Sequence, residues 1–199
     1  MAFSGSAGAG AYDDILAAAN DGNTATVVDL LRRGMDVNTA DRTGSTLLMI
    51  AARTGNQPLL QTLLANRVSI NRRNQYGDSA LMVAALNGKL AAVQILLDHG
   101  AQLDHNGWTP LHYAVFGGDK EVVGLVIAKG GKLDARAPNG QTALMLAVKN
   151  GKLELVKLLI DADADMDLAD FDGLTALRLA VQFGHSDIAA FLRKEGAVE

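Results

Sequence analysis

Residues 140–163 read GQTALMLAVKNGKLELVKLLIDAD, and this stretch decides the fold. Thr142 precedes one apolar run, and Gly151 separates that run from a second one with helical spacing. The pattern predicts two short helices joined by a tight turn. We expect the Thr142 side chain to accept a hydrogen bond from a free backbone amide of the first helix. Gly151 should end that helix in the left-handed conformation, which glycine adopts without steric cost.

The same pattern recurs along the whole chain at a nearly constant interval. Glycines equivalent to Gly151 follow one another in steps of 33, 33, 30, 33 and 33 residues. They are Gly22, Gly55, Gly88, Gly118, Gly151 and Gly184. Glycines equivalent to Gly140 share the single shortened step, and each has Ser or Thr two residues later: Thr46, Ser79, Thr109, Thr142 and Thr175. A fixed period of this length indicates a repeat architecture.

We therefore expect a single array over residues 11–199 in six units, preceded by a flexible segment at residues 1–10. The units are approximately 11–41, 42–74, 75–104, 105–137, 138–170 and 171–199. Asp13 is expected to cap the first helix in place of Ser or Thr. Arg67 and Asp163 stand where the other second helices end in glycine, and arginine should be the more strained of the two. Arg193 replaces an apolar residue, as a polar C-terminal cap requires.

Composition narrows the possible classes of protein. Of 199 residues 49% are hydrophobic and 20% charged, so the chain can bury a core. The absence of cysteine excludes disulfides, thiolate metal sites and cysteine nucleophiles. A net charge of −4 argues against a dedicated nucleic-acid binder. No apolar run is long enough to span a bilayer, and the stretch MAFSGSAGAG does not look like a signal peptide. We expect a soluble protein whose compartment the sequence leaves open: the cytoplasm, or the bacterial periplasm if the chain is a mature exported form.

The stretch Gly107-Trp108-Thr109-Pro110-Leu111-His112 is close to the signature phrase of the ankyrin repeat. Residues 151–172 (GKLELVKLLIDADADMDLADFD) match the second helix and exit loop of that repeat. The chain thus resembles the ankyrin repeat family, and its bacterial members in particular. The resemblance implies a mainly α solenoid of six helix–loop–helix units joined by β-hairpin-like loops. The histidine of the phrase occurs only as His112; the other units have Met49, Met82, Met145 and Arg178.

The resemblance also implies which positions are free to face a partner, namely the loop tips and the ends of the first helices on the concave face. Five of the nine aromatic residues fall at such positions: Tyr76, Trp108, Phe116, Phe171 and Phe183. Exposed aromatic side chains are the usual anchors of protein interfaces. With Leu86, Lys149 and Leu174 they form the candidate site, which we expect to be centred on Trp108 and Phe116. Some of these rings could instead pack on neighbouring loops of the array.

Two further features bear on a partner. Seven arginines between residues 30 and 75 and six aspartates between residues 161 and 172 predict a basic and an acidic region that could steer a dipolar partner. The shortened step removes three residues from the loop before Trp108. This shortening either creates a notch for a partner's side chain or is a neutral deletion.

Signals for chemistry are weak. His99, His105, His112 and His185 lack metal-ligand spacing, and the aspartate-rich run lacks the calcium-loop signature. The Gly-Lys pairs lack the other residues of a phosphate-binding loop. We expect a monomeric, non-catalytic scaffold without cofactor or metal that binds a protein partner. A regulator or inhibitor that blocks a partner enzyme is the alternative, and an aromatic face that pairs with a second copy also stays open.

Overall fold

The computed structural model describes residues 7–198 of the chain. Within that range it contains twelve α-helices, and its β-structure is limited to two isolated bridges, Ala40 with Thr46 and Ala169 with Thr175. The chain divides into two compact units between Gln102 and Leu103. The division falls in the loop that the 30-residue step shortens.

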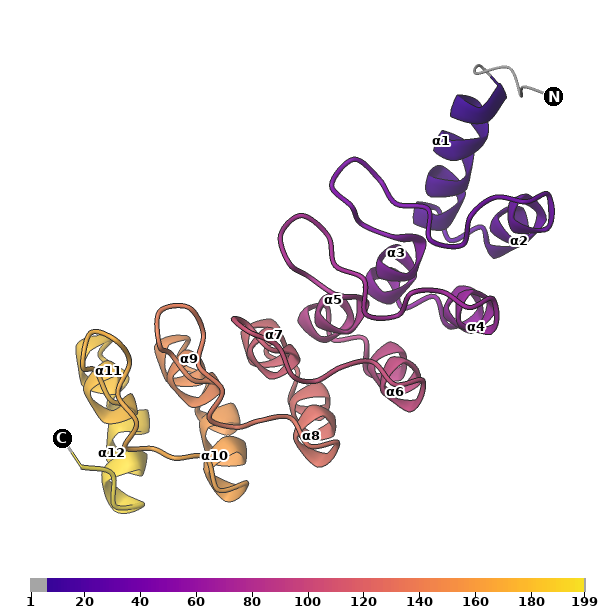
Figure 1. The fold of residues 1–199 in the computed structure, drawn as a ribbon. Coiled ribbons are helices and arrows are strands. Elements are labelled where there is room, and N and C mark those ends of the chain that lie inside the picture. Colours follow the sequence, from indigo (N-terminus) through magenta and orange to yellow (C-terminus); the bar gives the residue numbers. More distant parts are fainter. Residues whose placement is uncertain (1–6, 199) are drawn as a thin grey trace. The chain divides into compact units, whose positions relative to one another are not determined.

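Each unit contains six of the helices, which follow one another in pairs (Figure 1). The first unit has α1 (Ala7–Asn20), α2 (Thr24–Arg32), α3 (Leu47–Thr54), α4 (Gln57–Ala65), α5 (Ala80–Leu86) and α6 (Leu90–Asp98). The second has α7 (Pro110–Gly117), α8 (Lys120–Ala128), α9 (Ala143–Lys149), α10 (Leu153–Asp161), α11 (Ala176–Gln182) and α12 (Ser186–Lys194).

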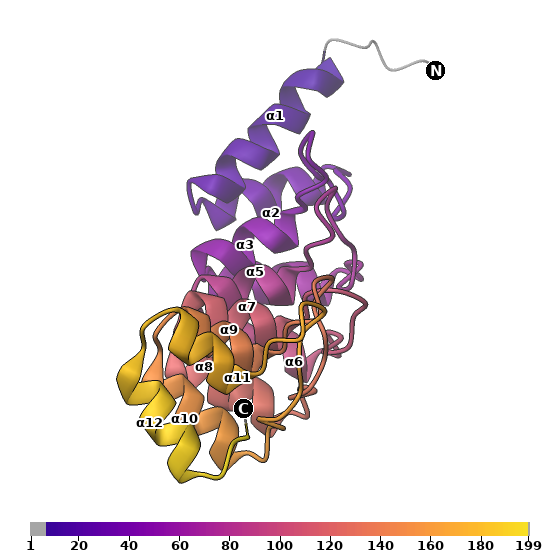
Figure 2. The same ribbon diagram turned by 90° about the vertical axis from the view of Figure 1, so that its left-hand side faces the viewer.

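Within each unit the helices form two layers. In the first unit α3 packs between α1 and α5, while α4 packs between α2 and α6. In the second unit α9 packs between α7 and α11, and α10 between α8 and α12. The long loops between pairs extend to one side of the helices in each unit (Figure 2). Exposed aromatic residues lie at loop tips and at the ends of odd-numbered helices, for example Tyr76 and Phe116.

From α3 to α11 the odd-numbered helices begin directly after the Ser and Thr residues that the repeat pattern indicates. The hydroxyls of Thr46, Ser79, Thr142 and Thr175 accept hydrogen bonds from the amide three residues later, at 3.2–3.4 Å. In three of these helices the sulfur of a methionine accepts a hydrogen bond from the amide of the capping residue. The amides of Thr46, Ser79 and Thr142 donate to the sulfur of Met49, Met82 and Met145 at 3.4 Å. A thioether is a weak acceptor, but it satisfies an amide that the helix leaves without a partner.

Small residues let neighbouring odd-numbered helices approach closely. The pairs Ala51-Ala52, Ala84-Ala85, Ala114-Val115 and Ala147-Val148 are all completely buried. The last pair differs, because Ala180 is buried while Val181 is 55% exposed. No helix of the described chain follows α12, so the outer side of α11 is left open.

Backbone amides of one pair bind side chains of the pair before it. Asn38 accepts from the amide of Ser69 at 2.8 Å, and Asn71 from that of Gln102 at 2.9 Å. In the second unit aspartate carboxylates accept these hydrogen bonds in place of asparagine amides. Asp134 accepts from the amide of Asp165 at 3.0 Å, and Asp167 from that of Val198 at 3.1 Å. Part of the aspartate-rich run is therefore structural.

The N-terminal end differs from the sequence prediction. Asp13 does not cap a helix, because α1 begins at Ala7 and runs through it. Residues 7–10, expected to be flexible, form the first turns of α1, while residues 1–6 lie outside the described residues. The helix continues back through Ala11, Ala9 and Ala7, which favour it, although Gly10 and Gly8 between them are poor helix formers. The single six-unit array stays a prediction.

The ends of the even-numbered helices confirm the predicted backbone conformations. Gly34, Gly100, Gly130 and Gly196 have positive φ, and so do Arg67, at φ 56°, and Asp163, at φ 69°. A side chain in this region costs about 1–2 kcal/mol, and aspartate tolerates it better than arginine. Arg67 is therefore a locally strained position in the first unit.

Replacing Arg67 with glycine should stabilise the chain. We expect Arg67→Gly to raise the free energy of unfolding by about 0.5–1 kcal/mol, since relief of strain exceeds the greater freedom of glycine in the unfolded chain. Asp163→Gly is the matched control and should gain less. Urea unfolding followed by circular dichroism measures both. A loss of stability in Arg67→Gly would show that the arginine side chain makes compensating contacts.

Candidate functional site

The centre of the predicted site is an aromatic group that extends from Trp108, just before α7, to Phe116 in the last turn of that helix. The Trp108 ring meets the Phe116 ring edge-on at 5.8 Å and the Tyr113 ring at 5.5 Å. Such edge-to-face pairs are favourable beyond the area they bury. Trp108 is half-buried by these contacts, while Phe116 is 53% exposed. The structure therefore brings Trp108 and Phe116 together, with the Phe116 ring on the outside.

A second group joins α9 to the end of α11. The Lys149 ammonium lies 5.7 Å from the centre of the Phe183 ring, a cation–π contact. The Phe183 ring stacks on His185 at 6.4 Å, and His185 Nε2 lies 3.3 Å from the carbonyl oxygen of Lys149. Phe183 remains 46% exposed. Lys149 and Phe183, predicted separately, thus form one patch that is both apolar and cationic.

The last long loop carries Phe171 and Leu174. Phe171 lies against Gly140 of the preceding loop, and its amide donates to the carbonyl of Asn139 at 3.3 Å. Its ring is nevertheless 71% exposed. Leu174 is half-buried and lines a pocket on α11 with Leu177 and Val181. Phe171 therefore belongs to the loop packing and to the surface at once.

Tyr76 and Leu86 belong to the other unit. Tyr76 is 70% exposed at a loop tip, and Leu86, at the end of α5, is 36% exposed. The other six predicted residues belong to the second unit. The predicted notch lies at the division between the units and stays a prediction.

His112 is buried beneath the aromatic group, and its role is structural. The Thr109 amide donates to Nδ1 at 3.2 Å, which leaves the proton on Nε2 to be donated to the Gln141 carbonyl at 3.2 Å. Burial lowers the pKa of His112 below its usual value, although the bond to Gln141 opposes that shift. The neutral ring thus links α7 to the next loop through the bond to Gln141.

Sequence reasoning missed Tyr113 and His185 as members of these two groups. Tyr113 stands at the position that Ile50, Val83 and Leu146 occupy in other pairs, so the repeat pattern assigns it to the core. The only indication in the sequence was that a tyrosine, with its large ring, stands where the other pairs have aliphatic residues. His185 follows Gly184 directly, and nothing in the sequence shows that its ring stacks on Phe183.

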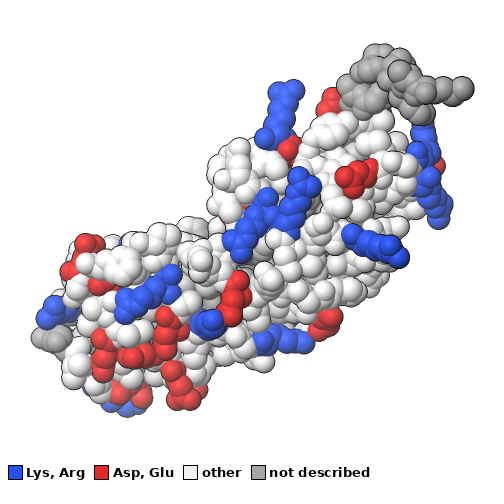
Figure 3. All heavy atoms as spheres, viewed as in Figure 1, with Lys and Arg blue, Asp and Glu red and all other residues white. Residues whose placement is uncertain are grey.

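Charge on the second unit is uneven. Asp and Glu side chains gather on the part of this unit where α10 and α12 lie (Figure 3). Glu154 of α10 accepts from Lys157 at 2.8 Å and pairs with Lys120 at 3.8 Å. Among the described residues no group of three or more His, Asp or Glu residues is placed to hold a metal ion. None of the described helices combines the length and apolar character needed to cross a membrane.

The two-layered helix pairs, with their caps and left-handed glycines, define a helical-repeat protein. A family model for ankyrin repeats in three copies matches residues 15–105, 55–137 and 118–198. The chain belongs to the ankyrin repeat family. No curated protein sequence matches the chain significantly. Ankyrin repeats are generally protein–protein interaction modules and are typically non-catalytic.

The buried neutral His112 predicts a pH dependence of stability. Its folded pKa lies below the unfolded value of about 6.5, so acidification protonates the unfolded chain first and favours unfolding. The urea midpoint of the wild type should fall more steeply than that of His112→Met as pH drops through about 6.5. Methionine fills this position in three other pairs, which makes the variant a matched control. Parallel slopes would contradict the assignment.

The contact of Phe171 with Gly140 predicts a difference between two glycines of similar conformation. A Cβ on Gly140, at φ 81°, would lie 2.7 Å from the Phe171 backbone nitrogen, whereas one on Gly173, at φ 77°, would meet nothing within 4 Å. Gly140→Ala should therefore destabilise the chain by at least about 1 kcal/mol more than Gly173→Ala. Thermal unfolding of both variants measures this difference. Equal losses would mean that the Phe171 loop moves aside freely.

Proposed function

We propose that this chain is a non-catalytic scaffold that binds a protein partner through the ends of its odd-numbered helices and its loop tips. The observation that carries the proposal is the Phe116 ring, which is 53% exposed and held edge-on by Trp108 at 5.8 Å. A large aromatic side chain that is already ordered binds without a further entropic cost of ordering. Such residues dominate the binding energy of protein interfaces.

The patch formed by Lys149 and Phe183 suggests which chemical groups of a partner would bind at the edge of this surface. Lys149 and Phe183 offer a cation and an exposed ring in contact with each other. A partner segment with an apolar side chain next to a carboxylate matches both groups. Phe171 and Leu174 extend the apolar surface along the loop tips. Tyr76 and Leu86 would contribute if the six pairs form one array, which is part of the proposal.

The scaffold is proposed to act as a monomer, with the aromatic surface reserved for a different protein. A partner that is an enzyme, blocked when this surface covers its active site, is the narrower alternative. The identity of the captured protein and its activity in the presence of the chain distinguish a scaffold from an inhibitor. Light scattering at several concentrations tests whether the surface is instead used between copies of this chain.

Loss of the Phe116 ring should weaken partner binding without unfolding the chain. We expect Phe116→Ala to reduce affinity for the partner by about 2 kcal/mol, roughly thirtyfold. Its melting temperature should change little because the ring is half outside the packing. Trp108→Ala should weaken binding and also lower the melting temperature, since the indole supports Tyr113 as well. The partner is first captured with the wild type and identified, and calorimetry with the purified partner then gives the affinities.

Leu90→Ala provides the control, because Leu90 is a comparably exposed (42%) large apolar residue that begins an even-numbered helix, α6, and is not one of the proposed binding residues. Its affinity should equal that of the wild type. If Phe116→Ala binds as tightly as Leu90→Ala, the aromatic group is only a packing feature. If Phe116→Ala melts far below the wild type, the ring is structural and the surface must be sought elsewhere.

A further inference from the structure

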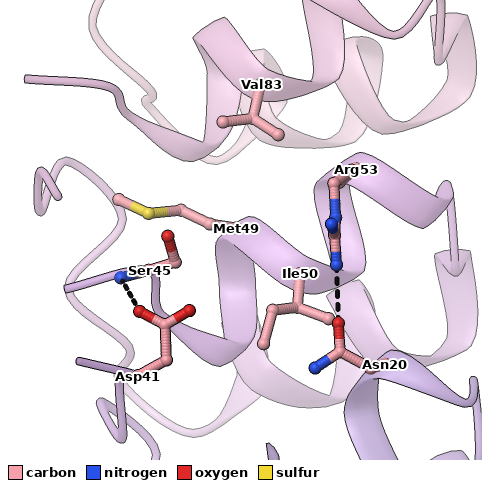
Figure 4. Close-up of a pocket in the computed structure, with 7 residues that line it drawn as sticks. All are labelled: Asn20, Asp41, Ser45, Met49, Ile50, Arg53 and Val83. Atoms are coloured by element: carbon pink, nitrogen blue, oxygen red, sulfur yellow. Dashed lines mark hydrogen bonds between the residues drawn. The ribbon is translucent and has the colours of Figure 1, made fainter. Parts of the chain in front are cut away.

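A small pocket of about 130 Å³ lies in the first unit, between the loop after α2 and the face of α3 (Figure 4). Its polar wall contains Asp41, Ser45 and Arg53, with Asn20 of α1 beside the arginine. Its apolar wall consists of Met49, Ile50 and Val83. Except for Arg53 and Ser45, these residues lie outside the positions that the repeat pattern leaves free. We call this feature the Asp41 pocket.

One carboxylate oxygen of Asp41 accepts hydrogen bonds within the loop, and the other faces the Asp41 pocket. Oδ1 accepts from the Thr43 amide at 2.8 Å, the Thr43 hydroxyl at 2.6 Å and the Ser45 amide at 2.9 Å. Within the described chain Oδ2 accepts no hydrogen bond, and Figure 4 shows it directed into the pocket. Burial raises the pKa of Asp41, but the bonds from Thr43 and Ser45 and the charge of Arg53 together lower it. The carboxylate is therefore ionised, with a strong acceptor facing the cavity.

The Ser45 hydroxyl is a second acceptor beside it. The Thr43 hydroxyl gives its proton to Asp41, so the Ser45 hydroxyl, 2.9 Å from Thr43 Oγ1, must donate to that oxygen. A hydroxyl has one proton and two lone pairs, so Ser45 can still accept. This end of the Asp41 pocket thus presents two acceptors and no remaining donor.

The opposite end presents a donor. The Arg53 guanidinium is held in place by a hydrogen bond to Asn20 Oδ1 (Figure 4). A guanidinium has five N–H groups, so others remain available for a ligand. A group with two donors at one end and an acceptor at the other matches this arrangement. A primary amide has that composition, whereas an ammonium has no acceptor and a carboxylate has no donor.

The second unit shows a glutamine amide on the equivalent carboxylate. Asp170 closes its own loop through Oδ1, which accepts from the amides of Asp172 and Leu174, as Asp41 does for Thr43 and Ser45. Its Oδ2 accepts from Gln141 Nε2 at 3.4 Å, a side chain supplied by the preceding long loop. Asp41 stands on the first long loop of the described residues, and within them no earlier long loop supplies such an amide.

We propose that the Asp41 pocket binds the side-chain amide of a glutamine from a protein partner. The amide nitrogen would donate to Asp41 Oδ2 and Ser45 Oγ, and its carbonyl would accept from Arg53, with the methylenes against Met49 and Ile50. The volume suits one side chain and is well below the roughly 300 Å³ of the smallest typical ligand pockets. The inference that the amide belongs to a protein partner rests on the proposed function. The inference that the Asp41 pocket binds a primary amide does not rest on it.

Three small probes of similar shape test the chemistry without the partner. Propionamide, propionate and propylammonium are titrated separately into the intact protein while ¹H–¹⁵N spectra are recorded. Propionamide should shift the amide signals of Thr43, Ser45 and Arg53 saturably, with a dissociation constant on the order of tens of millimolar for so small a ligand. Propionate and propylammonium should bind at least tenfold more weakly. Tighter binding of either charged probe, or no saturable shift with propionamide, would overturn the proposal.

Asp41→Asn is the decisive variant. Asn74 closes the next loop by accepting from the Tyr76 and Asp78 amides, each at 2.9 Å, so asparagine supports this turn. The substitution turns an acceptor into a donor and should weaken propionamide binding at least tenfold. Arg53→Gln, which introduces the residue found as Gln182 at the equivalent position, should weaken it less.

Asp170→Asn is the matched control. It makes the same substitution at the equivalent carboxylate, whose Oδ2 already accepts from the Gln141 amide. It should leave propionamide binding unchanged. Equal loss in Asp41→Asn and Asp170→Asn would overturn the assignment to the Asp41 pocket. If Phe116→Ala does not weaken partner binding, the proposed function is wrong, but the result of the propionamide titrations does not change. The two failures are therefore distinguishable.

Discussion

The short helices of this chain depend on burial against their neighbours. Helices α9 and α11 have seven residues each, well below the length at which an isolated helix is stable in water. Capping side chains satisfy the first amides, but they contribute only about 1 kcal/mol per helix. Completely buried residues such as Ala147 and Val148 show where the remaining stabilisation comes from. A helix pair cannot bury its apolar face alone, and the pairs beside it complete the core.

This dependence decides which residues remain available for function. Positions used for caps, left-handed turns and helix contacts are nearly the same in every pair. The residue two before the helix-ending glycine varies instead, as Arg53, Leu86, Phe116, Lys149 and Gln182. In the first unit that position helps to form a polar pocket, and in the second it carries an exposed ring and a cation on a ring. One framework thus presents chemically different surfaces along its length.

The sequence predicted the features that depend on local geometry. Glycine spacing and Ser or Thr caps were sufficient for the helix pairs, and Arg67 and Asp163 have the expected positive φ. Features that depend on contacts across pairs were not predictable in this way. The half-burial of Trp108 comes from Tyr113 at a core position, and the packing of Phe171 comes from a glycine in another loop. Asp13 was misassigned because α1 begins at Ala7 and runs through it, an extension that lies outside the repeated pattern.

Native-state hydrogen exchange of α9 and α11 tests most directly whether neighbours stabilise these helices. Their sequences, ALMLAVK and ALRLAVQ, differ at two positions, so their intrinsic helix propensities are nearly equal. Only α9 is packed between two odd-numbered helices of its unit, α7 and α11. The account predicts that amides of α9 exchange at least about tenfold more slowly than those of α11. Equal protection of the two helices would contradict it.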